Sequence, residues 1–258
     1  MHLIFIRHGD PDYKNDTLTE KGRKEAVFLA ERILKWKVDD FYVSPYGRAQ
    51  ATIAPALDLL GRSAETLDWL HEFDFRVSDP LTKKERCAWD WMPRDYYREE
   101  KYFNRKAWFR TKTMKSGGIE AHANNVCSCF DNLLAQYDYT RMENDTPIYS
   151  CFPHLTYDEA AVDTHLNPDQ KDLDNKNLVF VCHLGVMFLI ISHLTGISPV
   201  QLWQGFFVAP TSVTVLGAEE RAPGEVVFRV QQLGDVRHLM EHAEPASASG
   251  FYGNVLNL

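Results

Sequence analysis

Arg7, His8 and Gly9 combine three groups that suit the chemistry of a phosphoryl group. A guanidinium presents a planar fork of N–H donors that fits phosphoryl oxygens. An imidazole can act as a nucleophile and form a covalent intermediate, and a glycine lets the backbone approach a ligand closely. These residues end the apolar run Leu3–Ile6, which predicts a buried strand. They therefore lie where open α/β sheets bind ligands, although a structural Arg–His pair is the alternative.

Arg48 is a second candidate phosphate ligand, because it lies where a helix is expected to begin. Phe41–Ser44 predicts a short strand, and Ser44 before Pro45 is typical of an N-cap followed by the first helical residue. Arg48 then falls in the first helical turn, where free N–H groups and the helix dipole favour an anion. We expect Arg48 to face a phosphate there, and a solvated surface arginine is the alternative.

The pattern of strand, histidine and glycine occurs a second time, around His183. Leu178–Cys182 is the most apolar predicted strand of the chain, and His183 follows it directly. Gly185 lies at the turn, and an apolar helix is predicted to continue through Leu194. A single histidine at a strand end is usually structural, but the repeated pattern favours a functional pair.

In this order, the motifs resemble those of the histidine phosphatase (phosphoglycerate-mutase-like) superfamily. Each family motif has its counterpart at the expected place along the chain, and together they are far more specific than any one alone. The family's Arg-His-Gly matches Arg7, His8 and Gly9; its Leu-Thr-x-x-Gly-x-x-x-Ala matches Leu18, Thr19, Gly22 and Ala26; its Ser-Pro-x-x-Arg-Ala-x-x-Thr matches Ser44, Pro45, Arg48, Ala49 and Thr52; its Leu-x-Glu matches Leu70 and Glu72; and its second histidine matches His183.

The resemblance implies a role for each of these side chains. His8 would be the nucleophile that takes the phosphoryl group as a phosphohistidine. Arg7, Arg48 and His183 would bind the phosphoryl oxygens and stabilise the charge of the transition state. Glu72 would protonate the leaving group and then activate water. Asp74, two residues further on, is the competing carboxylate, and the Leu-x-Glu spacing favours Glu72.

The chain departs from the family pattern at several positions. Asp10 stands where the family usually has Glu, and Lys14 stands where it has Asn, with Asn15 one place late. Lys14 could add charge to the phosphate site or point to solvent. Leu184 replaces the first glycine of the usual His-Gly-Gly, and its backbone N–H would still be able to contact phosphate.

The order of predicted elements favours one α/β domain over residues 1–258, a three-layer α/β/α sandwich. A mostly parallel central sheet would carry an antiparallel edge formed by residues 212–216 and 226–230. An insertion at about 78–175 is expected to be a helical lid, with helices at 118–137 and 158–164. Its aromatic residues either pack on the core or line the pocket entrance, and His122, His154 and His165 could reach the pocket.

The net charge of −8 argues against nucleic acid and anionic membranes as partners, while a small phosphorylated substrate remains compatible with local arginines. Five irregularly spaced cysteines suggest free thiols in a reducing compartment. No signal peptide is expected, because the first strand begins at His2 and Leu3, and no apolar run is long enough to span a bilayer. We therefore expect a cytoplasmic protein. Cys127 and Cys129 have the wrong spacing for a zinc site, so no metal or cofactor is expected.

These observations predict a phosphomonoester hydrolase that acts on a small phosphorylated molecule. A phosphoglycerate-type mutase is the alternative within the resemblance, and the aromatic insertion weakly favours hydrolysis. A non-catalytic binding protein on the same fold is the third hypothesis. The sequence leaves the oligomeric state open.

Overall fold

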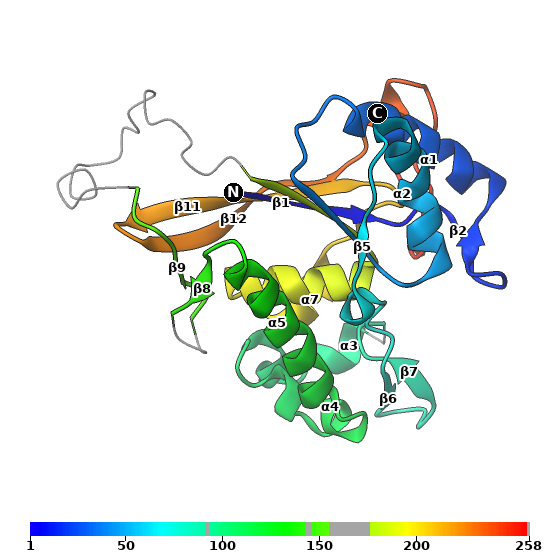
Figure 1. The fold of residues 1–258 in the computed structure, drawn as a ribbon. Coiled ribbons are helices and arrows are strands. Elements are labelled where there is room, and N and C mark those ends of the chain that lie inside the picture. The colour runs from blue at the N-terminus through cyan, green and yellow to red at the C-terminus, as the bar shows by residue number, and fades with distance from the viewer. Residues whose placement is uncertain (91–92, 143–145, 155–175, 257–258) are drawn as a thin grey trace.

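A computed structural model describes residues 1–90, 93–142, 146–154 and 176–256. Its largest feature is a curled sheet with helices on both sides (Figure 1). Across this sheet the strands follow the order β5 (Glu65–Thr66), β4 (Asp40–Val43), β10 (Asn177–Cys182), β1 (His2–Arg7), β11 (Val213–Ala222), β12 (Glu225–Asp235), β9 (Tyr149–Ser150) and β8 (Thr140–Arg141).

The sheet has a parallel part and an antiparallel part. Strands β5, β4, β10 and β1 run parallel, whereas β11, β12, β9 and β8 each run antiparallel to the preceding strand. The predicted hairpin β11–β12 is present, but it does not form the edge. Strands β9 and β8 of the insertion extend the sheet beyond it.

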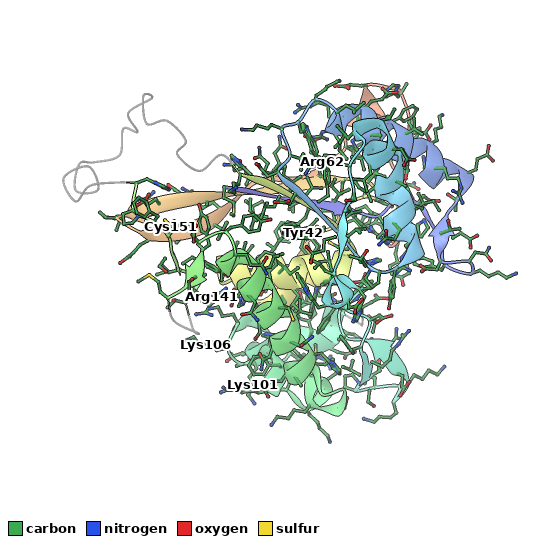
Figure 2. All side chains as sticks on the ribbon, viewed as in Figure 1. Tyr42, Arg62, Lys101, Lys106, Arg141 and Cys151 are labelled. Carbon is green, nitrogen blue, oxygen red and sulfur yellow. The ribbon has the colours of Figure 1, made fainter. Side chains whose placement is uncertain are left out.

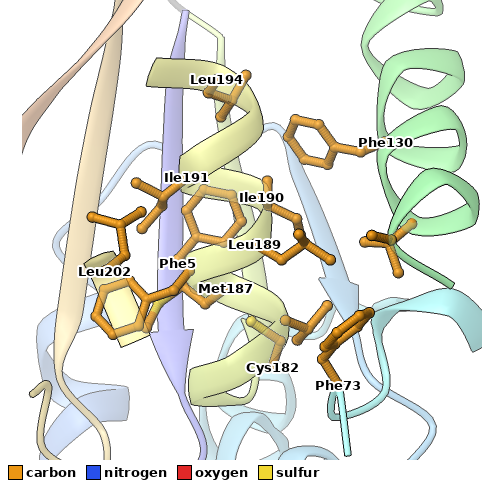
Figure 3. Packing of buried hydrophobic residues seen from close by; sticks show 14 of the residues in the cluster. Phe5, Phe73, Phe130, Cys182, Met187, Leu189, Ile190, Ile191, Leu194 and Leu202 are labelled. Carbon is orange, nitrogen blue, oxygen red and sulfur yellow. The ribbon is translucent and has the colours of Figure 1, made fainter. Parts of the chain in front are cut away.

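Alternating side chains of the central strands pack in two separate hydrophobic cores. On one face, Ile4 and Ile6 of β1 pack with helices α1 (Glu20–Ile33) and α2 (Gly47–Leu60). On the other face, Leu3 and Phe5 pack with α5 (Ile119–Ala135) and α7 (Leu184–Thr195). Figure 3 shows the second core, in which Phe5, Met187, Ile190 and Phe130 lie between β1, α7 and α5. The strand period of two therefore fixes which helices cover each face.

Shorter elements complete the described chain. No helix of these described ranges is long and apolar enough to cross a membrane. The remaining elements are β2 (Pro11–Asp12), β3 (Thr17–Leu18), β6 (Arg76–Ser78), β7 (Glu85–Cys87), α3 (Pro93–Tyr96), α4 (Lys112–Ser116), α8 (Pro199–Gly205), α9 (Arg237–Met240) and 3-10 helices over Asp68–Leu70, Glu100–Phe103 and Trp108–Arg110.

The helix ends agree with the local sequence in two cases and differ in a third. Thr19 caps α1, since its hydroxyl accepts from the Gly22 amide at 3.0 Å. Gly196 ends α7 in the left-handed conformation. The prediction that Ser44 caps the next helix is wrong, because α2 begins at Gly47 with Tyr46 as its N-cap. Arg48 nevertheless lies in the first turn, as expected.

Much of the insertion packs beneath the sheet. The predicted helix at 118–137 is confirmed as α5, whereas the helix expected at 158–164 and His165 lie outside the described residues. Tyr96, Tyr102 and Trp108 are buried in the core shared with α7. These three rings therefore serve packing, as one of the two sequence interpretations proposed.

A buried carboxyl supports the loop that follows β1. Glu25 of α1 is fully buried, and its Oε2 accepts from the Asp10 amide at 3.0 Å. Lys21 Nζ lies 3.5 Å from its other oxygen. Burial outweighs these contacts and raises the pKa of Glu25 from 4.5 to about 7.

This raised pKa predicts a pH-dependent gain in stability for the Glu25→Gln variant. Ionising Glu25 in the folded protein is unfavourable, so the wild-type free energy of unfolding falls as pH rises from 4.5 to about 7. The amide does not titrate but can still accept from Asp10. Urea titrations at several pH values should show the variant gaining up to about 3 kcal/mol over wild type across this window. A difference that does not change with pH would contradict this account.

Candidate active site

The two strand-end histidines meet at the carboxyl edge of the parallel strands. In the β1–β10 register Arg7 pairs with Cys182, and the His8 amide donates to the Cys182 carbonyl at 2.9 Å. His8 and His183 therefore leave the sheet side by side, with ring centroids 5.0 Å apart. Both histidines are buried.

The environment of His8 favours a neutral imidazole with a defined tautomer. Nδ1 lies 2.8 Å from the Gly9 carbonyl oxygen, which can only accept, so Nδ1 carries the proton. The lone pair then lies on Nε2. Burial, together with the positive charges of Arg7 and Arg48, lowers the pKa of His8 to about 3. The ring is therefore uncharged at neutral pH, and Nε2 can act as a nucleophile.

His183 is oriented by Ser44, which explains why Ser44 does not cap a helix. The Ser44 hydroxyl lies 2.7 Å from His183 Nε2 and accepts from the Tyr46 amide at 3.3 Å. If Ser44 donates to Nε2, the proton of the neutral ring lies on Nδ1. This buried Nδ1 has no hydrogen-bond partner within the described residues. Burial and nearby positive charges keep the pKa of His183 well below its usual value.

Arg7 is held by the C-terminal part of the chain. Its Nη1 donates to the Val208 carbonyl at 2.7 Å, and its Nη2 donates to the Ser249 carbonyl at 2.9 Å. Ser247 is also buried and donates to Asp10 of the loop after β1. Arg7 Nε is buried and unpaired among the residues that the structure describes. Two fixed contacts thus orient the guanidinium, while its Nε–H remains without an acceptor there.

Arg48 is held by Asp16, a residue that the sequence analysis missed. Arg48 Nη1 donates to Asp16 Oδ1 at 2.5 Å, and the Gly47 amide donates to Asp16 Oδ2 at 2.7 Å. Asp16 therefore occupies the anion position at the start of α2. The Arg48 guanidinium also lies 4.6 Å from the centroid of the Tyr46 ring. Its Nε is buried and lacks a hydrogen-bond partner in the described ranges.

Glu72 lies beside the start of α7. Its Oε1 accepts from the amides of Phe73 at 2.8 Å and Val186 at 3.1 Å. Burial outweighs these bonds and raises the pKa of Glu72. A Cβ at Gly185 would lie 2.6 Å from Glu72 Oε1, so this close approach requires glycine. Asp74, the competing carboxylate, is exposed.

Leu184 and Lys14 are the other two candidate residues, and only Leu184 lies next to the site. Leu184 is the first residue of α7, so its N–H is one of those without an acceptor inside the helix. Lys14 is exposed in the loop between β2 and β3, where its amide donates to Asp12. Its side chain has no contact among those that form the site described here. His122 contacts the ring of Phe75, whereas His154 lies next to Glu220 in the antiparallel part of the sheet.

A cluster of charged side chains around Asp131 lies at the C-terminal end of α7, away from His183. Asp131 binds Arg141 Nε at 3.0 Å and His193 Nε2 at 2.9 Å, and it accepts from Tyr149. Figure 2 labels Arg141 near β8, away from the carboxyl ends of β1 and β10. This cluster joins α5, α7 and the β8–β9 hairpin. Among the described residues, no group of three or more His, Cys, Asp or Glu could hold a metal ion.

Residues 3–114 match the family model of the histidine phosphatase superfamily (branch 1). The matched range includes Arg7, His8, Arg48 and Glu72. A probable phosphatase of Schizosaccharomyces pombe is 38% identical over 68 residues, which are 23% of this chain and 32% of that protein. The match thus spans about a third of the length of this curated relative.

Solved structures share the fold at low sequence identity. The phosphoserine phosphatase of Entamoeba histolytica in complex with 3-phosphoglyceric acid has a TM-score of 0.56 and 17% identity, covering 92% of this chain and 98% of that chain. The α-ribazole phosphatase of Shigella flexneri has a TM-score of 0.53 and 19% identity, covering 92% and 97%. A mycobacterial glucosyl-3-phosphoglycerate phosphatase has a TM-score of 0.53 and 15% identity, covering 90% and 98%.

The fold and the strand-end histidines agree with this match, and residues 3–114 are similar to the histidine phosphatase superfamily. Within that superfamily, the matching model is that of branch 1.

The contacts of Asp16 predict that it positions Arg48. Asp16→Asn keeps the side-chain shape and tolerates the positive φ of 47°, but it removes the charge that holds the guanidinium. We expect kcat/KM for a phosphomonoester to fall about tenfold. Asp12→Asn is the matched control, because Asp12 lies in the same loop and binds Asn15 and Lys14 instead. Equal kinetics for both variants and wild type would show that Asp16 does not position Arg48.

Proposed function

We propose that this protein hydrolyses a small phosphomonoester through a phosphohistidine on His8. The observation that carries the proposal is a set of buried N–H donors without partners on side chains that flank or electrostatically affect a neutral imidazole. Arg7 Nε, Arg48 Nε and His183 Nδ1 are buried without partners in the described part of the chain. The charges of both arginines act on His8 and His183. A buried N–H group without an acceptor lowers the stability of the fold. The three phosphoryl oxygens of a bound substrate would supply the missing acceptors.

In the first step, His8 Nε2 attacks phosphorus as the bond to the leaving oxygen breaks. Arg7, Arg48 and His183 neutralise the charge on the non-bridging oxygens, with the Leu184 amide as a further donor. Glu72 gives its proton to the leaving oxygen, and its raised pKa favours the protonated form that this step needs. The Gly9 carbonyl, bonded to Nδ1, stabilises the positive charge that develops on the ring.

In the second step, water attacks phosphorus and the N–P bond breaks. The ionised Glu72 accepts a proton from this water, which restores its acid form for the next turnover. His8 returns to its neutral state, and inorganic phosphate leaves. Glu72 is preferred over Asp74 because it is buried beside the start of α7, whereas Asp74 is exposed.

The proposal includes the organisation expected from the sequence. Residues 78–175 would form a lid on a single three-layer α/β/α domain, and residues 155–175 of it lie outside the described ranges. Lys14, exposed between β2 and β3, would either add charge to the site or point to solvent. A cytoplasmic location is supported by Cys87, Cys127, Cys129 and Cys182, which are thiols and not disulfides in the described part of the chain.

Replacing the nucleophile tests the covalent mechanism. His8→Ala should lower kcat for an aryl phosphate on the order of 10³-fold or more, because no other group accepts the phosphoryl group. Rapid quench of the wild type in alkaline detergent with labelled substrate should trap a phosphoprotein that is stable in base, labile in acid and absent from the variant. His242→Ala is the control, since this exposed ring stacks on Phe28. Near-normal turnover by folded His8→Ala protein would exclude the mechanism.

Glu72→Gln tests the acid–base assignment, because it keeps the shape and removes the transferable proton. An aryl phosphate, whose phenolate leaves unaided, should still phosphorylate His8, whereas an alkyl phosphate should not. Activation of water is also lost, so stopped-flow traces should show a burst of phenol followed by slow turnover. Asp74→Asn should leave both phases nearly unchanged.

The pH profile gives a second measurement of the same assignment. Wild-type kcat/KM for alkyl phosphates should fall as pH rises through the raised pKa of Glu72, because the acid form is lost. Glu72→Gln should lack this limb. A burst in Asp74→Asn with wild-type behaviour in Glu72→Gln would assign the role to Asp74.

A further inference from the structure

Four half-exposed rings form a continuous row that starts at the catalytic histidines. We call this row of Tyr46, His71, Phe75 and His122 the ring wall. Its ring centroids are separated by 5.9 Å between Tyr46 and His71, 5.8 Å between His71 and Phe75, and 3.5 Å between Phe75 and His122. The first three rings come from segments close to Arg48 and Glu72, and the last comes from α5 of the insertion.

The ring wall is continuous with the proposed phosphate site. Tyr46 packs edge-on against His183, with centroids 5.2 Å apart, and its ring lies under the Arg48 guanidinium. His71 directly precedes Glu72, and His71 Nδ1 donates to the Glu72 carbonyl at 2.8 Å. A leaving group bonded to the oxygen that Glu72 protonates would therefore emerge beside these rings.

An exposed carboxylate, that of Asp74, lies within electrostatic reach of the ring wall. Burial raises the pKa of Tyr46, the negative charge of Asp74 raises it further, and Arg48 opposes this effect. Asp74 is exposed, so its carboxylate is available to a molecule bound at the wall. A leaving group with its own carboxylate would meet this charge, whereas a neutral or cationic ring would not.

We propose that the ring wall is the leaving-group subsite and selects phosphomonoesters whose alcohol carries an uncharged or cationic planar ring. The inference rests on the proposed hydrolysis at His8 and specifies its substrate class. Planar rings gain from stacked and edge-to-face contacts with Tyr46, His71 and Phe75, beyond the gain from burial alone. The stack of His122 on Phe75 holds that ring in place for such contacts.

Benzyl phosphate and cyclohexylmethyl phosphate provide the matched pair of substrates. Both release a primary alcohol of similar size, so they make similar demands on Glu72 and differ mainly in the planar ring. We expect kcat/KM for benzyl phosphate to be about fivefold higher or more, mostly through a lower KM. Equal values for the two esters, or a preference for the cyclohexyl ester, would overturn the inference.

Phe75→Leu should bring the ratio of kcat/KM for benzyl phosphate to that for cyclohexylmethyl phosphate closer to one. The substitution keeps an apolar side chain but removes the ring. The ratio between two substrates within one variant does not depend on the fraction of protein that is folded. Phe152→Leu is the control, since Phe152 is 76% exposed and follows β9 in the antiparallel part of the sheet. An unchanged ratio in Phe75→Leu, or an equal loss in Phe152→Leu, would contradict the assignment.

A second pair of substrates tests the charge preference. Benzyl phosphate with a para-carboxamide should be hydrolysed with a higher kcat/KM than the same ester with a para-carboxylate. Asp74→Asn should narrow the difference in kcat/KM between these two esters. A preference for the carboxylate would overturn the proposed substrate class.

Binding of the uncleavable phosphonates separates this inference from the proposed reaction. Calorimetry with benzylphosphonate and cyclohexylmethylphosphonate measures selection by the ring wall without turnover. Preferential binding of benzylphosphonate without hydrolysis of any ester would refute the hydrolase and retain the subsite. Hydrolysis of all esters without preference in rate or binding would refute the subsite and retain the hydrolase.

Discussion

The parallel pairing of β1 with β10 is the constraint on which the site depends. It sets Arg7 opposite Cys182, so that His8 and His183 leave the sheet with ring centroids 5.0 Å apart. The two cores hold this register, because Leu3 and Phe5 face one and Ile4 and Ile6 face the other. A slip of one residue would reverse these faces and also separate the histidines. Stability and site geometry therefore rest on the same alternation.

Burial then gives the groups at this edge the protonation states that phosphoryl transfer needs. The same desolvation lowers the pKa of His8 and His183 and raises that of Glu72. Neutral imidazoles and a protonated carboxyl can thus coexist at one pH, as the proposed mechanism requires. Arg7 stays in this buried environment with carbonyl partners at Val208 and Ser249, so neither contact adds a competing negative charge.

Local patterns were sufficient to predict the central strands, the helices that follow them and the histidines at the strand ends, because each depends on a few adjacent residues. Contacts between distant segments left no such pattern. Asp16 meets Arg48 across 32 positions, and Ser249 meets Arg7 across 242. Ser44 before Pro45 fits an N-cap locally, but its hydroxyl is bonded to His183, 139 positions away. Strands β8 and β9 are two residues long, too short for any periodicity.

The aromatic composition of the insertion shows why composition alone could not locate the specificity of the site. Tyr96, Tyr102 and Trp108 are buried beneath the sheet and cannot meet a substrate there. The donors around His8 would contact the phosphoryl group, which every phosphomonoester shares, so they carry little information about the alcohol. Discrimination between substrates with different alcohols then has to come from groups that flank the proposed proton donor. At Glu72 these groups are rings and a carboxylate, which is why the proposed selectivity is for planarity and against negative charge.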